Sequence, residues 1–236
     1  LPQYLGLEQD ENVARYNCEY LYLPTLAELA VFGRLPNYVW RQILSCCMSF
    51  LSECREIPSE TRAQLCDEGF PAAFYDQIVR EKSRSRLKQF LDSRSWYGSK
   101  TIEVNGEMSP ALQDILETCI TLIPETGPKH LAYMHGDFFF GNSFFDFRAM
   151  RIKLIDPRGY MTSKKTTIYG DYRYDLAKLA HSVIGGYDLL LANRAGFVQF
   201  GPDRFELPDD FLAAQNGMTE VFKDLSLHQQ PVVSRE

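Results

Sequence analysis

The sequence predicts an α+β protein that is mostly helical, and three observations support this prediction. Strand-forming residues dominate the first two dozen positions, where "PQYLGLEQ" and "VARYNCEYLYL" flank the turn signal "DEN". A long stretch with helical spacing of apolar residues follows between Pro36 and Pro58. Further along, "SFFDFRAMRIKLIDPRGY" reads as two strands joined by a turn at 147–149. We therefore expect a mostly helical body with a β-hairpin near the centre of the chain.

The segment between the two prolines is the clearest amphipathic helix. Its apolar residues recur at helical spacing and would form one buried face, which comprises Val39, Trp40, Ile43, Leu44, Cys47, Met48 and Leu51. The cysteines of this segment are expected to pack as small hydrophobic side chains, because free cysteine is commonly buried.

Further helices are expected on either side of a short hairpin. Residues 60–97 have helical character and a strongly basic face, which we interpret as a solvated helix surface. Asn105-Gly106 is a turn signal between short extended pieces, and Pro110 opens a helix that runs to about Leu122. "KHLAYMHGD" predicts a short strand that enters a loop, and "YDLAKLAHSVIGGYDLLLANR" predicts a helix.

Composition and charge argue against several classes of protein. The chain has 236 residues and a formal net charge of −6, without a basic block that would bind nucleic acid non-specifically. Its six cysteines show no C-x-x-C pair and no zinc-type spacing with histidine, so we expect reduced thiols in a cytoplasmic protein. No apolar run reaches the roughly 18–20 residues that a membrane span requires.

The stretch "YMHGDFFFGNSFFDF" places polar side chains among six phenylalanines, which we expect to pack and seat the loop. Asp137 and Asn142 lie five positions apart in this loop, and Asp156 follows at the end of the second hairpin strand. Because a hairpin returns the chain to where it left, Asn142 and Asp156 should come close together. Amide and carboxylate oxygens at one point suit Mg²⁺ or Mn²⁺. With Asp137 near enough to orient a hydroxyl, this combination predicts phosphoryl transfer.

Four motifs, in the same order, resemble the aminoglycoside phosphotransferase and choline kinase family, whose members share the protein-kinase fold. "HGDFFFGN" is similar to the catalytic loop H-G-D-x-x-x-x-N, and "IDPRG" stands where the family has its metal motif. "GDYRYDLAKL" is similar to the segment G-D-P-x-x-D-L-A-x-L, and "CEYLYLPTLAEL" is similar to the strand and linker between the kinase lobes. The resemblance implies a kinase-like C-terminal lobe in residues 25–236, with a remnant of the small lobe and the hinge strand in residues 1–24.

The resemblance also implies the roles of the residues that match. Asp137 would be the catalytic base that orients the acceptor hydroxyl, with Asn142 and Asp156 as ligands of Mg²⁺. The alternative for Asp137 is a helix-cap or turn residue. ATP would be the phosphoryl donor, and its adenine would meet the backbone of the hinge residues Glu19, Tyr20 and Leu21.

Three further residues have a supporting role with a structural alternative. His135 would hydrogen-bond backbone near the metal site, or be an ordinary structural histidine. Asp175 resembles the buried aspartate that holds the amides of the catalytic loop, or would be a helix N-cap. Arg158 stands beside the metal motif and would clamp a phosphate or a substrate carboxylate, or else form a plain salt bridge. Pro157 would bias Asp156 toward an extended backbone.

The sequence departs from a complete kinase at its N-terminal side. It has no glycine-rich phosphate loop, and its first lysine is Lys82, well past the expected hinge. The phosphate-binding lysine of the small lobe therefore lies outside this sequence, is replaced, or does not exist.

Two functions follow as the leading expectations. The first is an ATP-dependent phosphotransferase with a small hydroxyl compound as acceptor. The motifs are similar to kinase-like modules of bacterial capsule and surface-polysaccharide biosynthesis proteins, which implies a sugar or polyol and a fused or partner nucleotidyltransferase domain. The second is a non-catalytic kinase-like module that binds a nucleotide or another ligand. A metal-dependent hydrolase would need a second metal site, for which the sequence offers no carboxylate or histidine cluster.

Overall fold

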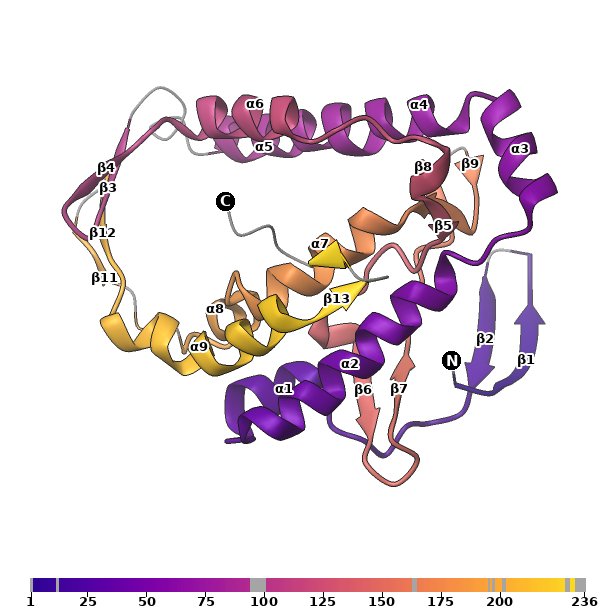
Figure 1. The fold of residues 1–236 in the computed structure, drawn as a ribbon, viewed down its shortest axis with the longest axis horizontal. Coiled ribbons are helices and arrows are strands. Elements are labelled where there is room, and N and C mark those ends of the chain that lie inside the picture. The colour runs from indigo at the N-terminus through magenta and orange to yellow at the C-terminus, as the bar shows by residue number, and fades with distance from the viewer. Residues whose placement is uncertain are drawn as a thin grey trace.

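The computed structural model describes residues 2–11, 13–93, 101–162, 165–194, 196, 198–200, 203–227 and 230–231. Helices form most of this part of the chain and the sheets are small, so the protein belongs to the α+β class, as predicted (Figure 1). None of the helices in these ranges combines the length and the hydropathy that a membrane span requires.

The helices form an upper and a lower layer in the view of Figure 1. Helices α4, α5 and α6 lie across the top, whereas α1, α2, α7, α8 and α9 lie below them. Their bounds are α1 (Leu26–Phe32), α2 (Asn37–Cys54), α3 (Ser59–Asp67), α4 (Phe70–Phe74), the π-helical η1 (Tyr75–Glu81), α5 (Lys82–Ser93), α6 (Leu112–Leu122), α7 (Tyr172–Val183), α8 (Tyr187–Leu191) and α9 (Asp209–Asp224). Two short 3₁₀ turns, η2 (Pro128–His130) and η3 (Phe140–Asn142), lie before and after β5.

The strands pair almost entirely as hairpins or short ribbons. The antiparallel pairs are β1 (Tyr4–Gln9) with β2 (Ala14–Cys18), β5 (Leu131–Tyr133) with β10 (Tyr169–Asp171), β6 (Ser143–Asp146) with β7 (Arg151–Leu154), β8 (Tyr160–Thr162) with β9 (Lys165–Thr166), and β13 (Ser226–Leu227) with β14 (Gln230–Pro231). One four-stranded sheet has the order β11 (Val198–Gln199), β12 (Arg204–Glu206), β3 (Ile102–Val104) and β4 (Glu107–Ser109).

Most elements that the sequence predicted are present. The helix between the two prolines is α2, and its buried face comprises Trp40, Ile43, Leu44, Cys47, Met48 and Leu51. The Asn105-Gly106 hairpin is β3–β4, the helix that follows it is α6, and the central hairpin is β6–β7. The helical region 60–97 is interrupted at Gly69, whose φ of 67° ends α3, and its last residues, 94–97, lie outside the described residues.

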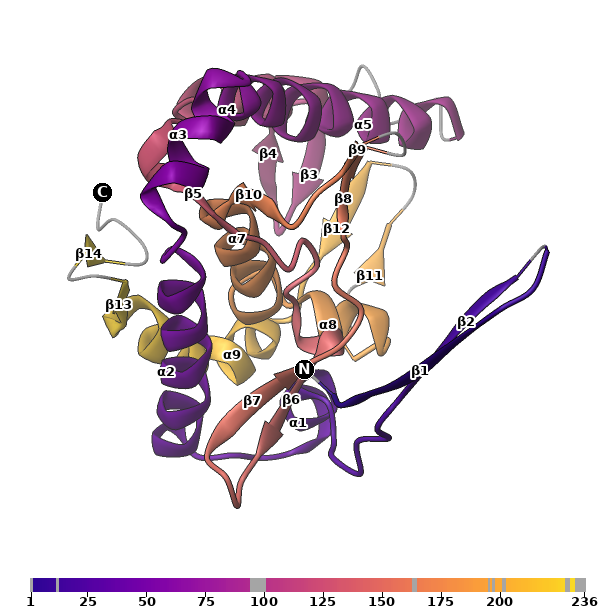
Figure 2. The same ribbon diagram turned by 90° about the vertical axis from the view of Figure 1, so that its right-hand side faces the viewer.

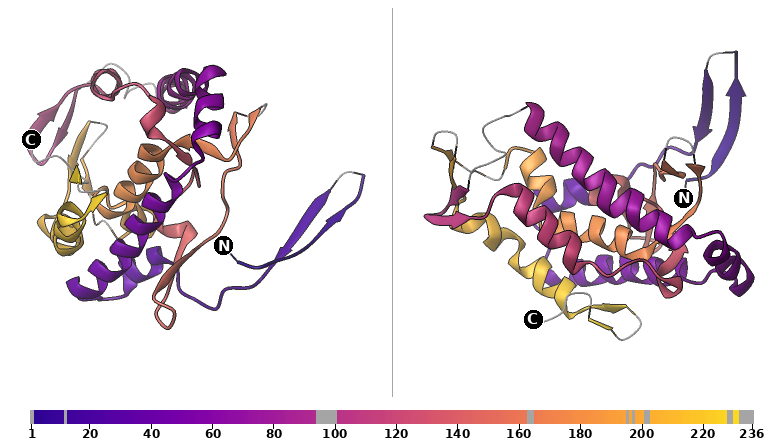
Figure 3. Two further views of the ribbon diagram at one scale, coloured as in Figure 1. Left: turned by 45° about the vertical axis from the view of Figure 1, so that its right-hand side comes forward. Right: turned by 90° about the horizontal axis from the view of Figure 1, so that it is seen from above.

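The first two strands are present, but the second is shorter than the sequence suggested. β2 ends at Cys18, and residues 19–24 run on as irregular chain toward α1. The β1–β2 hairpin extends away from the helical body (Figures 2 and 3). Its apolar side chains, such as Tyr4, Leu7 and Tyr16, are accordingly exposed.

Two hydrophobic clusters meet at the loop between β5 and β6. The larger cluster draws on α1, α2, α7, α9 and the β6–β7 hairpin, and it includes Phe138, Phe140 and Phe145. The smaller cluster draws on α3, α4, η1, β5 and β8, and it includes Met134. The loop therefore crosses from one cluster to the other between Met134 and Phe138. Between them lie His135, Gly136 and Asp137, and the side chains of His135 and Asp137 are polar.

Candidate active site

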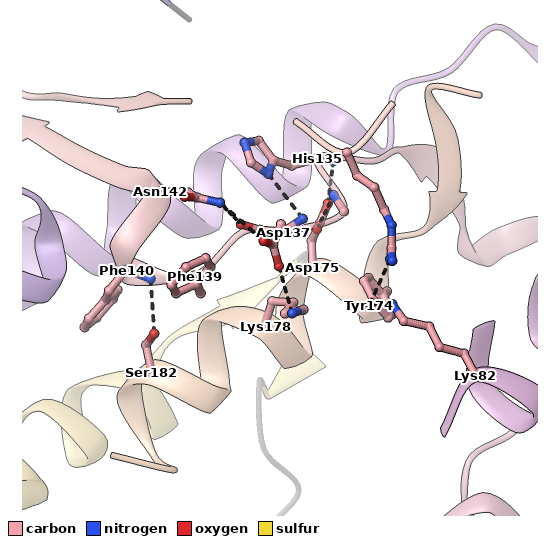
Figure 4. Close-up of polar contacts among 12 residues, drawn as sticks. Lys82, His135, Asp137, Phe139, Phe140, Asn142, Tyr174, Asp175, Lys178 and Ser182 are labelled. Atoms are coloured by element: carbon pink, nitrogen blue, oxygen red, sulfur yellow. Dashed lines mark hydrogen bonds and ion pairs between the residues drawn. The ribbon is translucent and has the colours of Figure 1, made fainter. Parts of the chain in front are cut away.

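Asp175 fixes the start of the loop that follows β5. Its side chain lies on α7 and is 2% exposed. The carboxylate accepts the backbone N–H of His135 at 2.7 Å and that of Gly136 at 2.8 Å (Figure 4). Burial raises the pKa of Asp175 to about 6, although hydrogen bonds from these backbone amides act to lower it. The loop backbone is thus tied to helix α7 at the point where it enters the site.

The N-cap of α7 is a different aspartate. Asp171 precedes the helix and accepts the N–H of Arg173, whose guanidinium also pairs with the Asp171 carboxylate. Thr126 donates its hydroxyl to the same carboxylate at 2.7 Å. The capping alternative for Asp175 is therefore wrong, since Asp171 caps the helix and Asp175 binds the loop.

His135 is buried directly beside this anchor. Its Nδ1 accepts the N–H of Asp137 at 3.3 Å, and burial lowers the pKa of the imidazole. Its Nε2 is buried close to the Ile155 carbonyl, which acts to raise that pKa, but the two atoms do not reach full hydrogen-bond geometry. His135 therefore supports the loop as a neutral side chain and contacts the backbone before Asp156.

Asp137 points both of its carboxylate oxygens toward polar partners. Lys178 on α7 lies 2.8 Å from Oδ1, and the Asn142 amide donates to the Asp137 carbonyl at 3.1 Å and to Oδ2 at 3.4 Å (Figure 4). Both the Lys178 and the Asp137 side chains are about a third exposed, at 32% and 38%. The carboxylate is thus oriented but still open to a ligand.

Asp156 has an unusual backbone conformation. The N–H of Ile155 donates to the Asn142 carbonyl at 3.1 Å, and the N–H of Arg158 donates to the His135 carbonyl at 2.7 Å. Between these two contacts the chain must turn, and Asp156 has φ = 57°, in the left-handed region. The expectation of an extended backbone before Pro157 was wrong, because these contacts override the local preference. A strained residue at this position costs on the order of 1–3 kcal/mol, and such residues cluster at functional sites.

The oxygens of Asn142 and Asp156 fit magnesium in type. The Asn142 amide nitrogen faces Asp137, so its oxygen is left as an acceptor, and Asp156 lines the cavity with Asp137. Magnesium is commonly held by one or two protein oxygens together with substrate phosphates and water. Within the described residues no cluster of three or more His, Cys, Asp or Glu could hold a metal. These residues therefore suit a metal that arrives with a phosphate ligand, rather than a metal held by protein alone.

Arg158 lies across the loop from Asp175. A Cβ added to Gly136, which has φ = 81°, would stand 2.6 Å from the Arg158 Cβ, so the glycine allows the two segments to touch. The guanidinium donates from Nη1 to the Tyr174 hydroxyl at 3.1 Å. Among the described residues Arg158 forms no ion pair with a carboxylate, so the plain salt-bridge alternative finds no partner there.

Asp137, Asp156 and Arg158 line a cavity of about 550 Å³, whereas Asn142, His135 and Asp175 are not among its lining residues. Its charged lining residues are Asp137, Asp156, Lys82, Arg86, Arg158 and Lys178. Three of these residues were not predicted from the sequence as part of a site: Lys178 on α7, and Lys82 and Arg86 on α5. Lys178 stands one helical turn after Asp175, a spacing that places the two side chains on neighbouring positions of one helix face, and this signal could have identified it. Lys82 and Arg86 belong to the basic face that we expected to be only a solvated surface.

The hinge residues lie apart from this cavity, which they do not line. The N–H of Glu19 donates to the Gln3 carbonyl at 2.8 Å, and its carboxylate lies 3.4 Å from Lys153 on β7. Tyr20 is 73% exposed, and Leu21 is partly buried. The segment Glu19–Leu21 therefore contacts the β6–β7 hairpin through Glu19.

No protein-family model matches this chain, and no curated protein matches its sequence.

Proposed function

We propose that this chain is the large lobe of a protein-kinase-like phosphotransferase of the aminoglycoside phosphotransferase and choline kinase type. It would transfer the γ-phosphoryl group of ATP to a hydroxyl of a small molecule. The observation that carries the proposal is that Asp137 and Asp156 line one cavity while Asp175 ties down the loop that bears Asp137. Phosphoryl transfer depends on such positioning and on charge stabilisation, with little covalent chemistry from the protein.

In the proposed reaction the acceptor oxygen attacks the γ-phosphorus of ATP. The bond from that phosphorus to the β–γ bridging oxygen breaks, and ADP leaves. The hydroxyl proton passes to the Asp137 carboxylate and then to solvent, which restores the carboxylate. Because the proton leaves late in a loose transition state, the orientation of Asp137 by Lys178 and Asn142 matters more than its basicity.

Asn142 and Asp156 would hold the magnesium ion that comes with the nucleotide. When bound, this ion neutralises charge on the transferring phosphates. His135 would keep the two halves of this site together, because its imidazole contacts the Asp137 amide and lies beside the Ile155 carbonyl.

The remaining expectations belong to the same proposal. Residues 1–24 would supply the last strands of the small lobe, and the backbone of Glu19, Tyr20 and Leu21 would approach the adenine. The protein would act in the cytoplasm on a sugar or polyol for capsule or surface polysaccharide, together with a fused or partner nucleotidyltransferase domain.

Titration calorimetry of ATP, with and without magnesium, tests the nucleotide site of this chain. Asp156→Asn removes the ligand charge and keeps a side chain that tolerates the left-handed backbone. We expect it to weaken magnesium-ATP binding at least about tenfold, whereas Asp137→Asn should stay within about twofold of the parent affinity. Asp67→Asn, an exposed carboxylate on α3, is the matched control and should leave binding unchanged.

The transfer step is tested by ADP formation with a panel of sugars, polyols and their phosphate esters. Asp137→Asn should lower the rate about 10²- to 10⁴-fold at saturating ATP. Magnesium-dependent ATP binding without transfer to any acceptor would favour the non-catalytic binding module. ATP binding that is indifferent both to magnesium and to Asp156→Asn would overturn the proposal.

A further inference from the structure

The cavity beside Asp137 is more positive than a site for a neutral or cationic acceptor needs. We propose that it recognises an acceptor that carries an anionic group, a phosphate or a carboxylate, and that Lys82, Arg86 and Arg158 bind this group. The inference rests on the proposed function and names the substrate class of the same site. It concerns the side of Asp137 that faces helix α5.

Two cations converge on one phenol in this cavity. Lys82 donates to the Tyr174 hydroxyl at 2.8 Å, and Arg158 donates to the same oxygen at 3.1 Å (Figure 4). A phenol has two lone pairs and one O–H donor, so these two contacts take up both of its acceptor positions. Burial acts to raise the pKa of Tyr174, but the hydrogen bond and charge of Lys82, together with Arg158, outweigh it and the pKa is lowered.

The cluster of Lys82, Arg158 and Tyr174 has hydrogen-bond donors without partners among the described residues, whereas the acceptor positions of the Tyr174 oxygen are occupied. The ammonium of Lys82 has further N–H donors, the Tyr174 O–H is available, and Nε of Arg158 is buried without a hydrogen-bond partner. A buried donor without a partner is unfavourable and calls for an explanation. A ligand that only accepts hydrogen bonds, such as a phosphate or carboxylate, would accept from the donors of Lys82 and Tyr174, which line the cavity. Nε of Arg158 has almost no accessible surface, so it is not one of these contacts.

The cavity is lined by more positive than negative side chains. Four cations and two carboxylates line it, and Asp137 is already paired with Lys178. No ion pair is found for Lys82, Arg86 or Arg158 within the part of the chain that the structure describes. This positive cavity belongs to a protein with a formal net charge of −6, so it stands out from the average surface. An anionic ligand would be attracted to it.

The position of these cations favours the acceptor over the nucleotide. Lys82 and Arg86 lie on α5, which runs across the top of Figure 1, whereas the hinge residue Glu19 lies beside the β6–β7 hairpin below. Tyr174 and Lys178 on α7 lie between these two sides and line the same cavity as Asp137. An acceptor anchored at α5 through its anionic group would thus extend its hydroxyl toward Asp137. Choline and aminoglycosides are cations, and these side chains would repel them.

Binding in the absence of ATP and magnesium tests this inference separately from phosphoryl transfer. The probes are D-glucose 6-phosphate, D-glucuronate, D-glucose and inorganic phosphate, titrated at one fixed ionic strength. We expect the phosphate ester or the uronate to bind at least about tenfold more tightly than D-glucose, and inorganic phosphate to compete with it. The comparison of ester with uronate identifies which anionic group the site takes.

The variants Lys82→Gln, Arg86→Gln and Tyr174→Phe assign the contacts. We expect the first two, combined, to weaken binding of the anionic probe at least about tenfold and Tyr174→Phe to weaken it about threefold. Arg84→Gln is the matched control, because Arg84 lies on the same helix but does not line the cavity and pairs with Glu117 on α6 at 2.6 Å. Circular dichroism of each variant shows whether it is folded.

Three outcomes would overturn the inference. The first is equal affinity for D-glucose, its 6-phosphate and D-glucuronate. The second is equal loss of binding in Arg84→Gln and in the double variant Lys82→Gln/Arg86→Gln. The third is a loss of magnesium-ATP affinity in the double variant that matches the loss for the anionic probe, because the cations would then serve the nucleotide. A failure of phosphoryl transfer alone leaves these binding measurements interpretable.

Discussion

Nζ of Lys178 lies 2.8 Å from Oδ1 of Asp137, so a lysine from α7 neutralises the carboxylate that we propose as the catalytic base. The two residues come from segments about forty positions apart, and they meet because Asp175, one turn before Lys178, binds the loop of Asp137. Helix α7 therefore performs two tasks in the site. Asp175 in its first turn fixes the loop backbone, and Lys178, one turn later, orients the Asp137 carboxylate.

Replacing Lys178 tests whether helix α7 orients the Asp137 carboxylate. In Lys178→Met the Asp137 carboxylate keeps, among the described side chains, the long contact with Asn142, so its orientation becomes less defined. We expect kcat of phosphoryl transfer to fall about 10- to 100-fold, with magnesium-ATP affinity nearly unchanged. Lys223→Met, which removes an exposed i,i+3 pair with Glu220 on α9, is the control. Unchanged kcat in Lys178→Met would contradict the orienting role.

Replacing Asp156 by glycine separates backbone strain from metal binding. Asp156 has φ = 57°, a conformation that glycine adopts without penalty. We expect Asp156→Gly to raise the free energy of unfolding by up to about 1 kcal/mol in the absence of nucleotide. The same variant should lose the increase in melting temperature that magnesium-ATP gives the parent. If Asp156→Gly is less stable without nucleotide, or keeps the full magnesium-ATP response, the assignment is contradicted.

Most of the local structure could be predicted because its signals are local. The α2 helix, the Asn105-Gly106 hairpin and the β6–β7 hairpin follow from periodicity, proline positions and turn residues. Helix α1 was missed although its capping box is visible in the sequence, since Thr25 and Glu28 hold each other's backbone N–H. Helix α9 was not predicted either, and Pro208 lies at its N-cap.

The candidate site could be predicted only in part, because some of its residues come from segments far apart in the sequence and meet only through tertiary packing. Asp137, Asn142 and Asp156 could be predicted as neighbours because loop and hairpin lie on a short stretch of chain; Asp137 and Asp156 line the cavity, and Asn142 contacts Asp137 without lining it. The cations of the cavity could not be found in this way, because Lys82 lies fifty-five positions before Asp137 and reaches the cavity only through the tertiary placement of α5, from which it contacts Tyr174 on α7. The left-handed backbone of Asp156 was also unpredictable, because contacts to Asn142 and His135 on either side impose it against the preference before Pro157.

The buried carboxylate of Asp175 predicts a specific pH dependence of stability. Burial raises its pKa from 3.8 to about 6 in the folded protein, so the folded state holds its proton more tightly than the unfolded state. This contribution to stability is fully present below pH 3.8 and is lost as the pH rises through about 6. Relative to Asp175→Asn, the parent protein should lose up to about 3 kcal/mol between pH 4 and 7.

Urea unfolding of both proteins from pH 4 to 7.5 measures this difference, because the other titrating groups are shared and largely cancel. Asp175→Asn also has a constant penalty of about 1–3 kcal/mol, since His135 and Gly136 donate to different carboxylate oxygens and one of these becomes an NH₂ donor in asparagine. The pH-dependent part is therefore the informative quantity. A difference between the two proteins that stays constant with pH would show that burial does not raise the Asp175 pKa.

The close approach of Gly136 and Arg158 predicts that alanine at position 136 destabilises the protein. An alanine at position 136 has two penalties, the left-handed backbone at φ = 81° and a Cβ that would stand 2.6 Å from the Arg158 Cβ. Gly106 offers a matched control, because its φ is 82° and nothing lies within 4 Å of its added Cβ. Gly106→Ala should lower the free energy of unfolding by about 1–2 kcal/mol through the backbone alone.

Gly136→Ala should therefore lower the free energy of unfolding by about 1–3 kcal/mol more than Gly106→Ala does, the usual range for an overpacked contact. It should also weaken binding of the anionic probe several-fold, because relief of the clash moves Arg158 away from Tyr174, while Gly106→Ala should bind as the parent does. Urea unfolding and the same titrations measure both effects. Equal destabilisation by the two substitutions would mean that Arg158 does not pack against the loop, and the link between the loop and the anion-binding residues would then be lost.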